Sequence, residues 1–598
     1  MGTASATPYA ANLAALANAA WERDADKVVM KYTDANDNWI DVTGREVREY
    51  VDAVAKGLIA KGVKVGDRVG IMSRTRYEWT VLDFAIWSAG AVPVPIYDTS
   101  SKEQIDWIVS DAEVSLLFVE TKEHYKLAEK VARGESPLKE VLVIEDGALT
   151  AVVSGGANVS DEELAKRKES TNHDSLATIM YTSGTTGRPK GVRLTHFSYC
   201  RHIHGITEEL YPVLYQDGAT ALMFLTLAHS LARLVEVAFV SAGVVMGFCP
   251  DTKKLVPLIG TLKPTILLAV PRVYEKVYNS AEQKAAAGGK VKIFRWAAAQ
   301  AVAYSEALLT PEGPSAGLKL RHKIAHKLVL HKIADVLGGR VRFAISGSAP
   351  LGTRHAHFYR GVGLEIMEGY GLTENNAAAS VHRPGGYKPG TVGPALPGIE
   401  FSIADDGEIL MRGEQLFEGY HRNPEATAEA MRDGWFHTGD LGSLDEDGHL
   451  RITGRKKELI VTAGGKNVSP AILEERIRSY SLVSQCVVVG DGKPFIAALV
   501  TLDEEALPGW LKGKELPAMS AQEAAEHPVV REHLEKAIAR ANKAVSRAES
   551  VRAYEILPED LTIENGYLTP SMKVKRDKVI ADFQHLIDKM YSGTPKSA

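Results

Sequence analysis

A glycine- and hydroxyl-rich segment, Tyr181–Val192, carries the strongest chemical signal in the sequence. Its three glycines allow tight turns that bring backbone N–H groups near an anion, and its four serine and threonine hydroxyls, with Arg188 and Lys190, add further donors. No carboxylate competes within the segment, and an apolar strand at 177–180 precedes it. This composition favours a loop that wraps a triphosphate. It differs from the common P-loop because Pro189 stands where that motif requires its second glycine.

Four further strings surround polar residues that could serve the same chemistry. They follow the first segment in the order Gly369–Glu374, Trp435–Asp440, Gly454–Ile460 and 565–576. Taken singly, each polar residue has an ordinary interpretation. Glu374 would be a solvated acid, Asp440 a turn cap, and Lys573 a surface lysine in a basic tail.

Together and in this order, the strings resemble the core motifs of the adenylate-forming superfamily, which includes acyl-CoA synthetases, luciferases and peptide-synthetase adenylation domains. Leu225–Arg233 is similar to a stretch of the long-chain fatty acyl-CoA synthetases, with Thr226 replacing the usual proline. Ala463–Pro470 also looks like that branch, and Tyr97–Ser101 resembles its bacterial members.

The resemblance implies a role for each matching residue. Glu374 would bind Mg²⁺, which prefers oxygen ligands, and Thr373 would hydrogen-bond the α-phosphate of ATP. Tyr370 would stack on adenine, and Gly347 would let the backbone approach the base. Asp440 would accept hydrogen bonds from the ribose, with Arg455 nearby. The β- and γ-phosphates would be held by Thr182, Ser183, Gly184, Thr185, Thr186, Gly187 and Lys190.

The remaining implied roles concern the acyl group and a change of domain position. Lys573 would bridge the substrate carboxylate and the α-phosphate, where negative charges converge. His229 would border the acyl and thiol channel. Lys457 would be the hinge about which a C-terminal domain rotates, presenting Gly464 and Gly465 to the pantetheine arm of CoA. Some apolar residues of 231–248 would line the acyl tunnel.

The implied activity is the ATP-dependent ligation of a long-chain fatty acid to CoA through an acyl-adenylate. The ATP motifs do not separate long-chain acids from medium-chain or aromatic ones. A fatty acyl-AMP ligase stays an alternative, and so does a non-catalytic ATP-binding homologue. The joint presence of Glu374, Asp440, Arg455 and Lys573 argues against the last.

Alternating helical and strand patterns in the first third predict an α/β fold with mostly parallel sheets. A polar loop is expected at 154–172 and a helical insertion at about 281–337. The pattern of polar and apolar residues changes near 455. This change predicts a large N-terminal domain at 1–455 and a small mobile α+β domain at 456–598.

The composition excludes several classes of protein. A net charge of −5 gives no global field for binding nucleic acid. The three cysteines, Cys200, Cys249 and Cys486, lie far apart and predict neither a disulfide framework nor a zinc site, which fits the cytoplasm. The sequence shows no membrane span, leaves a peripheral membrane contact open, and does not determine the oligomeric state.

Overall fold

An eight-stranded sheet lies at the centre of the N-terminal part of the chain. The computed structural model describes residues 9–132, 136–182, 188–569 and 572–592. All pairs within this sheet are parallel except β1 with β2 and β13 with β14. In spatial order the strands are β14 (Ser380–Val381), β13 (Glu365–Tyr370), β12 (Phe343–Ser346), β11 (Ile266–Ala269), β9 (Thr220–Met223), β10 (Val245–Phe248), β1 (Val28–Thr33) and β2 (Trp39–Thr43).

A second, four-stranded sheet is parallel throughout. Its order is β4 (Val92–Ile96), β3 (Arg68–Met72), β5 (Val114–Val119) and β6 (Glu140–Val143). A three-stranded antiparallel sheet of β7 (Leu176–Thr182), β8 (Lys190–Thr195) and β17 (Gly419–Tyr420) lies against β4, and the hydroxyl of Thr178 donates to the carbonyl of Pro93. The predicted α/β fold with mostly parallel sheets is therefore confirmed.

Helices cover these sheets, and their limits follow local sequence signals. Thr43 and Ser101 each begin a helix with a capping box. The helices of this part are α1 (Leu13–Arg23), α2 (Gly44–Ala60), α3 (Tyr77–Ser88), α4 (Lys102–Asp111), α5 (Lys122–Ala132), α6 (Ala148–Gly155), α7 (Asp161–Glu169), α8 (His196–Glu209), α9 (Tyr211–Leu214), α10 (Ser230–Ala242) and α11 (Leu255–Leu262).

The loop expected at 154–172 is wrong in part, because α7 occupies Asp161–Glu169. Ser160 caps the helix, acids fill its first turn and bases its last, so charges at both ends complement the helix dipole. Only Leu164 is buried on this helix, which explains why no apolar period marked it.

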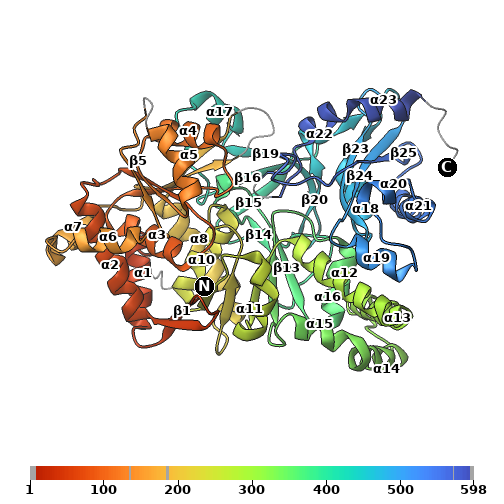
Figure 1. The fold of residues 1–598 in the computed structure, drawn as a ribbon, viewed down its shortest axis with the longest axis horizontal. Coiled ribbons are helices and arrows are strands. Elements are labelled where there is room, and N and C mark those ends of the chain that lie inside the picture. The colour runs from red at the N-terminus through yellow and green to blue at the C-terminus, as the bar shows by residue number, and fades with distance from the viewer. Residues whose placement is uncertain (1–8, 133–135, 183–187, 570–571, 593–598) are drawn as a thin grey trace.

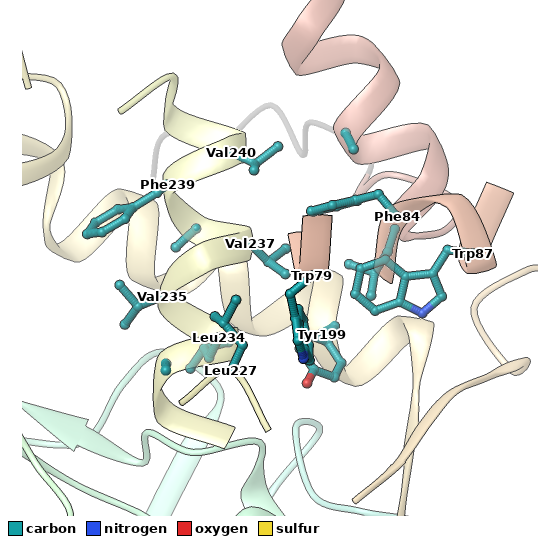
Figure 2. Close-up of a cluster of buried hydrophobic side chains, with 14 of the residues drawn as sticks. Trp79, Phe84, Trp87, Tyr199, Leu227, Leu234, Val235, Val237, Phe239 and Val240 are labelled. Carbon is teal, nitrogen blue, oxygen red and sulfur yellow. The ribbon is translucent and has the colours of Figure 1, made fainter. Parts of the chain in front are cut away.

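A packed aromatic and aliphatic cluster joins α3, α8 and α10 (Figure 2). Both α3 and α10 are buried on nearly all sides, which explains their lack of a polar face. Trp79, Phe84, Trp87 and Tyr199 supply the large rings, and α10 contributes Leu234, Val237 and Phe239. This cluster fixes the start of α10, where His229 stands as N-cap.

A helical segment follows α11 and packs below the C-terminal part in the view of Figure 1. It starts at Pro271, before the expected position 281, because proline is well suited to the first turn of a helix. Its elements are α12 (Pro271–Ala287), α13 (Val291–Ala307), α14 (Ala316–Ala325), a π turn (His326–Leu330) and α15 (His331–Val336), with α16 (Thr353–Val362) after β12.

A mainly antiparallel region leads from this body to the C-terminal elements. It contains the short helices η3 (Thr373–Asn375) and α17 (Pro424–Ala430) and ends in η4 (Lys456–Glu458). Its five-stranded sheet holds β15 (Ile399–Ile403), β16 (Glu408–Gly413), β18 (Met431–Arg432), β19 (Trp435–Leu444) and β20 (Leu450–Arg455).

The smaller α+β domain expected at the C-terminus is confirmed. The sheet of β23, β24 and β25 carries one apolar cluster on each face, because neighbouring strand residues point to opposite sides. The elements are β21 (Ile460–Val461), β22 (Asn467–Val468), α18 (Pro470–Arg478), β23 (Val483–Val489), β24 (Ile496–Leu502), α19 (Leu507–Gly513), α20 (Ala521–Glu526), α21 (Pro528–Asn542), β25 (Val551–Ile556), α22 (Arg576–Asp582) and α23 (Gln584–Ser592). None of the helices in the described ranges is both long and apolar enough to cross a membrane.

Candidate active site

Asp440 lies at the centre of a polar cluster formed by three separate segments. The antiparallel pairing of β19 and β20 places Asp440 opposite Arg455, whose Nε is 2.9 Å from Oδ1. The hydroxyl of Tyr370, at the end of β13, donates to the other carboxylate oxygen at 2.7 Å. Burial and the Asp440 charge raise the pKa of Tyr370 well above its ordinary value, so its hydroxyl stays a donor. The structure thus brings these three predicted residues together.

A second cluster surrounds Glu374. This buried residue lies in η3 beside Thr373, and its Oε1 accepts a 2.8 Å hydrogen bond from the hydroxyl of Tyr420. The ammonium of Lys190 lies over the same tyrosine ring, 4.9 Å from the centroid. Burial and the Glu374 charge raise the pKa of Tyr420. Lys190, Tyr420 and Glu374 therefore form one connected group.

The predicted phosphate-binding segment connects β7 to β8. Thr182 pairs with Lys190 at the ends of these antiparallel strands. Ser183, Gly184, Thr185, Thr186 and Gly187 lie outside the described residues. After them, the guanidinium of Arg188 lies over Trp107, whose Nε1 donates to the carbonyl of Pro189 at 2.8 Å.

Lys573, in the C-terminal domain, lies close enough to these two clusters for their charges to act on its ammonium group. Its backbone N–H donates to Oγ1 of Thr569 at 3.0 Å, which holds the loop before α22. The Lys573 side chain keeps contact with solvent, although neighbouring protein groups displace part of its hydration shell. Lost hydration and the positive charge of Arg455 lower its pKa, while the charges of Asp440 and Glu374 act in the opposite direction. The structure therefore places Lys573 within the electrostatic reach of both predicted carboxylates.

His229 and Gly347 both lie beside Leu231 of α10. Nδ1 of His229 accepts from the N–H of Leu231 at 3.3 Å, and burial together with the Lys573 charge lowers the His229 pKa to about 4. A Cβ on Gly347 would stand 3.1 Å from Cδ2 of Leu231 and 3.6 Å from the carbonyl of Gly369. Glycine at 347 therefore keeps the space between α10 and β13 open.

Three predicted residues are not brought to these clusters. Gly464 and Gly465 form the turn between β21 and β22, where the neighbouring Ala463 N–H donates to the carbonyl of Lys493 in the same domain. Lys457 is exposed in η4, directly after β20. The structure leaves the predicted CoA and hinge roles of these three residues open.

A large cavity of about 1510 Å³ opens beside His229. Its walls come from α10, from the helical segment and from the C-terminal domain. Apolar lining residues include Leu231, Val273, Val277, Phe294 and Ile333. Of the range 231–248 that we expected to contribute to an acyl tunnel, only Leu231 and Ala232 line this cavity. The rest of α10 packs into the core because it is buried on nearly all sides.

Ion pairs hold the C-terminal domain against the helical segment. Arg272, on α12, donates to Asp503 at 2.7 Å and to the hydroxyl of Ser484 at 3.3 Å. One turn further along α12, Lys276 pairs with Glu505. These contacts lie at the cavity wall and stabilise the domain arrangement in which Lys573 reaches the carboxylate clusters.

Sequence reasoning missed two features of this region. Tyr420 carried no recognised motif, although its Gly-Tyr string precedes a helix-starting Asn-Pro pair. Arg233 stood in a quoted motif without a role, yet it is fully buried and donates twice to Asp83, at 2.8 and 2.6 Å. Arg233 also donates to Thr178 at 2.7 Å, so it ties α10 to α3 and β7.

The carboxylates suit a nucleotide-bound metal better than a resident one. No group of three or more histidine, cysteine, aspartate or glutamate side chains in the described part of the chain could hold a metal ion. Glu374 offers a single carboxylate, which Tyr420 connects to Lys190. Magnesium typically takes one or two carboxylates and completes its shell with phosphates and water. The donor set therefore fits Mg²⁺ carried by a nucleotide.

Comparison with known proteins places this geometry in a family. Residues 17–421 match the family of AMP-binding enzymes, and residues 457–595 match the AMP-binding enzyme C-terminal domain. The long-chain-fatty-acid–CoA ligase FadD15 of Mycobacterium bovis is 48% identical over 96% of both chains. Human long-chain-fatty-acid–CoA ligase 1 is 31% identical over 92% of this chain and 82% of that protein.

Solved structures share the fold across nearly the whole chain. The anthranilate CoA ligase AuaEII, in complex with anthranoyl-AMP, superposes with a TM-score of 0.72 at 19% identity, covering 97% of this chain and 99% of that one. The A domain of the carboxylic acid reductase from Segniliparus rugosus, with AMP, gives a TM-score of 0.74 at 20% identity over 98% and 95%. With the family matches and the clusters around Asp440 and Glu374, these similarities show that the chain belongs to the AMP-binding, adenylate-forming enzymes.

Proposed function

We propose that the protein is an AMP-forming long-chain fatty acid:CoA ligase. The observation that carries the proposal is the largely apolar cavity of about 1510 Å³, which His229 lines close to Lys573. An adenylating site beside a large, mainly apolar cavity suits an acid with a bulky hydrocarbon chain. The 48% identity to a mycobacterial long-chain-fatty-acid–CoA ligase supports the same substrate class.

In the first half-reaction, a carboxylate oxygen of the fatty acid attacks the α-phosphorus of ATP, and the bond to pyrophosphate breaks. Two anions must meet, so positioning and charge neutralisation carry this step. Lys573 bridges the carboxylate and the α-phosphate. Thr373 donates to the same phosphate, and Glu374 would hold the Mg²⁺ that neutralises the departing phosphates. Thr182, Lys190 and the loop between them bind the β- and γ-phosphates.

The adenosine half of the nucleotide would lie between Tyr370 and Gly347, with the ribose hydroxyls donating to Asp440. Arg455 holds that carboxylate in place through its 2.9 Å contact. Burial keeps the Tyr370 hydroxyl protonated, so it stays a hydrogen-bond donor to Asp440. This hydrogen bond fixes the orientation of the tyrosine ring.

In the second half-reaction, the CoA thiol attacks the acyl carbonyl carbon, the thiol proton leaves, and AMP departs. We assign residues 1–455 to the N-terminal domain and 456–598 to the C-terminal domain, with the hinge at Lys457. Rotation about this hinge withdraws Lys573 and presents Gly464 and Gly465 to the pantetheine arm. The free, buried cysteines support a reducing, cytoplasmic location.

The test follows pyrophosphate release and thioester formation in parallel, with Mg-ATP, CoA and acetate, octanoate, laurate, palmitate or stearate. We expect both products, with the highest kcat/KM for laurate to stearate. Pyrophosphate with acyl-adenylate but no thioester would instead indicate a fatty acyl-AMP ligase. Absence of pyrophosphate with every acid would overturn the proposal.

A further inference from the structure

The mouth of the large cavity is ringed by exposed apolar side chains from separate elements. Val256 of α11, Ile293 of α13, Leu328 of the π turn and Val336 of α15 all line the cavity and are also among the exposed large hydrophobic residues. Exposure and cavity lining coincide only where a cavity opens to the surface. The cavity therefore has an apolar rim on the helical segment.

The rim continues as an apolar row along α14. Leu320, Ile324 and Leu328 follow one another at four-residue intervals on the continuous helical run 316–336, so they share one face. They are 61%, 43% and 50% exposed. Isolated exposed hydrophobic residues are common, but a row that joins an apolar cavity rim marks an interaction surface.

Positive charge surrounds this row. Lys319, Lys323 and Lys327 stand one residue before each apolar position and are all exposed. Lys284, Lys290 and Lys332 also line the cavity and are exposed. Residues 271–336 hold eleven lysines and arginines against five aspartates and glutamates, whereas the whole chain has a net charge of −5. The basic residues are thus concentrated on the helical segment.

We propose that this surface, defined by Leu320, Ile324, Leu328 and the lysines beside them, docks on the surface of an anionic lipid bilayer. Exposed apolar residues interleaved with lysines are the pattern of a helix that lies in the interface, since its apolar side enters the acyl region and its lysines meet the headgroups. Docking places the cavity rim against the membrane. If the proposed ligase function holds, the fatty acid then passes from the bilayer into the cavity without crossing water.

The binding test uses the full-length protein without ATP and follows co-sedimentation with vesicles. We expect binding to phosphatidylcholine vesicles that contain phosphatidylglycerol, weaker binding to phosphatidylcholine alone, and loss of binding at high salt. Replacing the three lysines with glutamine should weaken binding at least about tenfold. The variant carries Lys319→Gln, Lys323→Gln and Lys327→Gln.

Helix α5 provides a matched control. Lys122, Lys126 and Lys130 have the same four-residue spacing and are likewise exposed, so Lys122→Gln with Lys126→Gln and Lys130→Gln makes the same charge change elsewhere. This control should bind vesicles like the parent protein. Equal losses in both triple variants, or no loss in either, would overturn the proposal.

The apolar row is tested separately by Leu320→Ser with Ile324→Ser, which lie outside the cavity lining. This variant should also bind vesicles at least about tenfold more weakly, whereas Val65→Ser, at another exposed apolar position, should not. A parent protein that binds no vesicles but forms a dimer, which the paired serine variant dissociates, would overturn membrane docking in favour of a second copy of the chain.

The two proposals fail in different ways. Palmitate is supplied either dispersed in detergent or embedded in the mixed vesicles, and thioester is measured. The paired serine variant should keep its rate with dispersed palmitate and lose rate with embedded palmitate. Vesicle binding without thioester from any acid would remove the ligase function and leave docking in place. Thioester formation without vesicle binding would remove docking alone.

Discussion

The hydroxyl of Tyr420 donates to Oε1 of Glu374 at 2.8 Å, while the ammonium of Lys190 lies 4.9 Å from the centroid of the same tyrosine ring. One side chain thus contacts both the proposed magnesium ligand and the lysine that ends the phosphate loop. Its hydroxyl fixes the direction of a carboxylate lone pair, and its ring lies under a cation.

Tyr420→Phe removes the hydroxyl and keeps the ring. Because hydrogen bonds to charged groups contribute about 1.5–3 kcal/mol, we expect kcat/KM for Mg-ATP to fall by about ten- to a hundredfold. Tyr420→Leu should cost more, since the cation–π contact is lost as well. The measurement is pyrophosphate release over a range of Mg²⁺ and ATP. Tyr591→Phe, which removes a hydroxyl within the C-terminal domain, is the control and should have no effect. Unchanged kinetics in both Tyr420 variants would contradict the assignment.

Lys573→Ala should separate the two half-reactions. Removing the positive charge that bridges carboxylate and phosphate should slow the release of pyrophosphate by at least about a hundredfold. Thioester formation from supplied acyl-adenylate and CoA should stay near the parent rate, because Lys573 is withdrawn for that step. Lys575→Ala, an exposed lysine two residues further on, is the control. Equal losses in both half-reactions of Lys573→Ala would contradict its role.

Asp440→Asn keeps the shape of the side chain and removes its charge. Arg455 then loses its ion-pair partner and the ribose loses a charged acceptor, so the KM for ATP should rise by about tenfold. Tyr370→Phe removes one hydrogen bond and leaves the ring, so its effect on the KM should be smaller. Initial rates at saturating fatty acid measure both. A rise in the KM for fatty acid with an unchanged KM for ATP would count against ribose binding.

The buried ion pair between Arg233 and Asp83 leads to a stability prediction. Arg233 is enclosed by Trp79, Trp87 and Tyr199, and both charges are fully buried. Arg233→Met leaves an unpaired buried carboxylate and should lower the free energy of unfolding by about 3–5 kcal/mol. Adding Asp83→Leu removes that charge, so the double variant should recover part of the loss. Thermal midpoints compare the two variants. A double variant less stable than Arg233→Met would contradict this account.

Glu236 should make stability depend on pH. Burial and the negative charge of Asp83 raise its pKa, so the folded protein holds a proton that the unfolded chain releases. This stabilisation is complete below the ordinary carboxyl pKa and is lost as pH rises through the raised value. Glu236→Gln stays neutral and keeps an oxygen that can accept from Thr80. Its thermal midpoint should therefore fall less than that of the parent from weakly acidic to alkaline pH. Parallel curves would contradict the prediction.

Local sequence patterns predicted many helices and strands. Some of the features that these patterns missed depend on contacts between residues far apart in the sequence. The helix at α2 could be predicted because its apolar residues repeat with the helical period, and the strand at β5 because it is a short, nearly continuous apolar run. Helix α7 was missed because it buries only Leu164 and owes its ends to caps and charges. Nothing in the neighbourhood of Tyr420 encodes its contact with Glu374, because the sheet of β7, β8 and β17 creates it.

The position of the acyl-binding residues could not be predicted for a related reason. An apolar run such as 231–248 has the same sequence pattern whether its side chains line a cavity or pack in a core. In the structure α10 passes through the core, and much of the apolar cavity wall comes from helices α12, α13 and α15, which follow α10 in the sequence. Only the three-dimensional packing decides between the two uses of apolar residues.

The cavity wall belongs to both domains, since His229 lines it from one side and Leu568 from the other. If the C-terminal domain rotates as proposed, a chain bound there stabilises the domain position that completes the wall, and by reciprocity that position binds the chain more tightly by the same factor. Acid selectivity is then not a matter of tunnel length alone. Ion pairs between the domains, such as Arg272–Asp503, then influence acid affinity through the population of the arrangement that completes the wall, in addition to any contact with the chain.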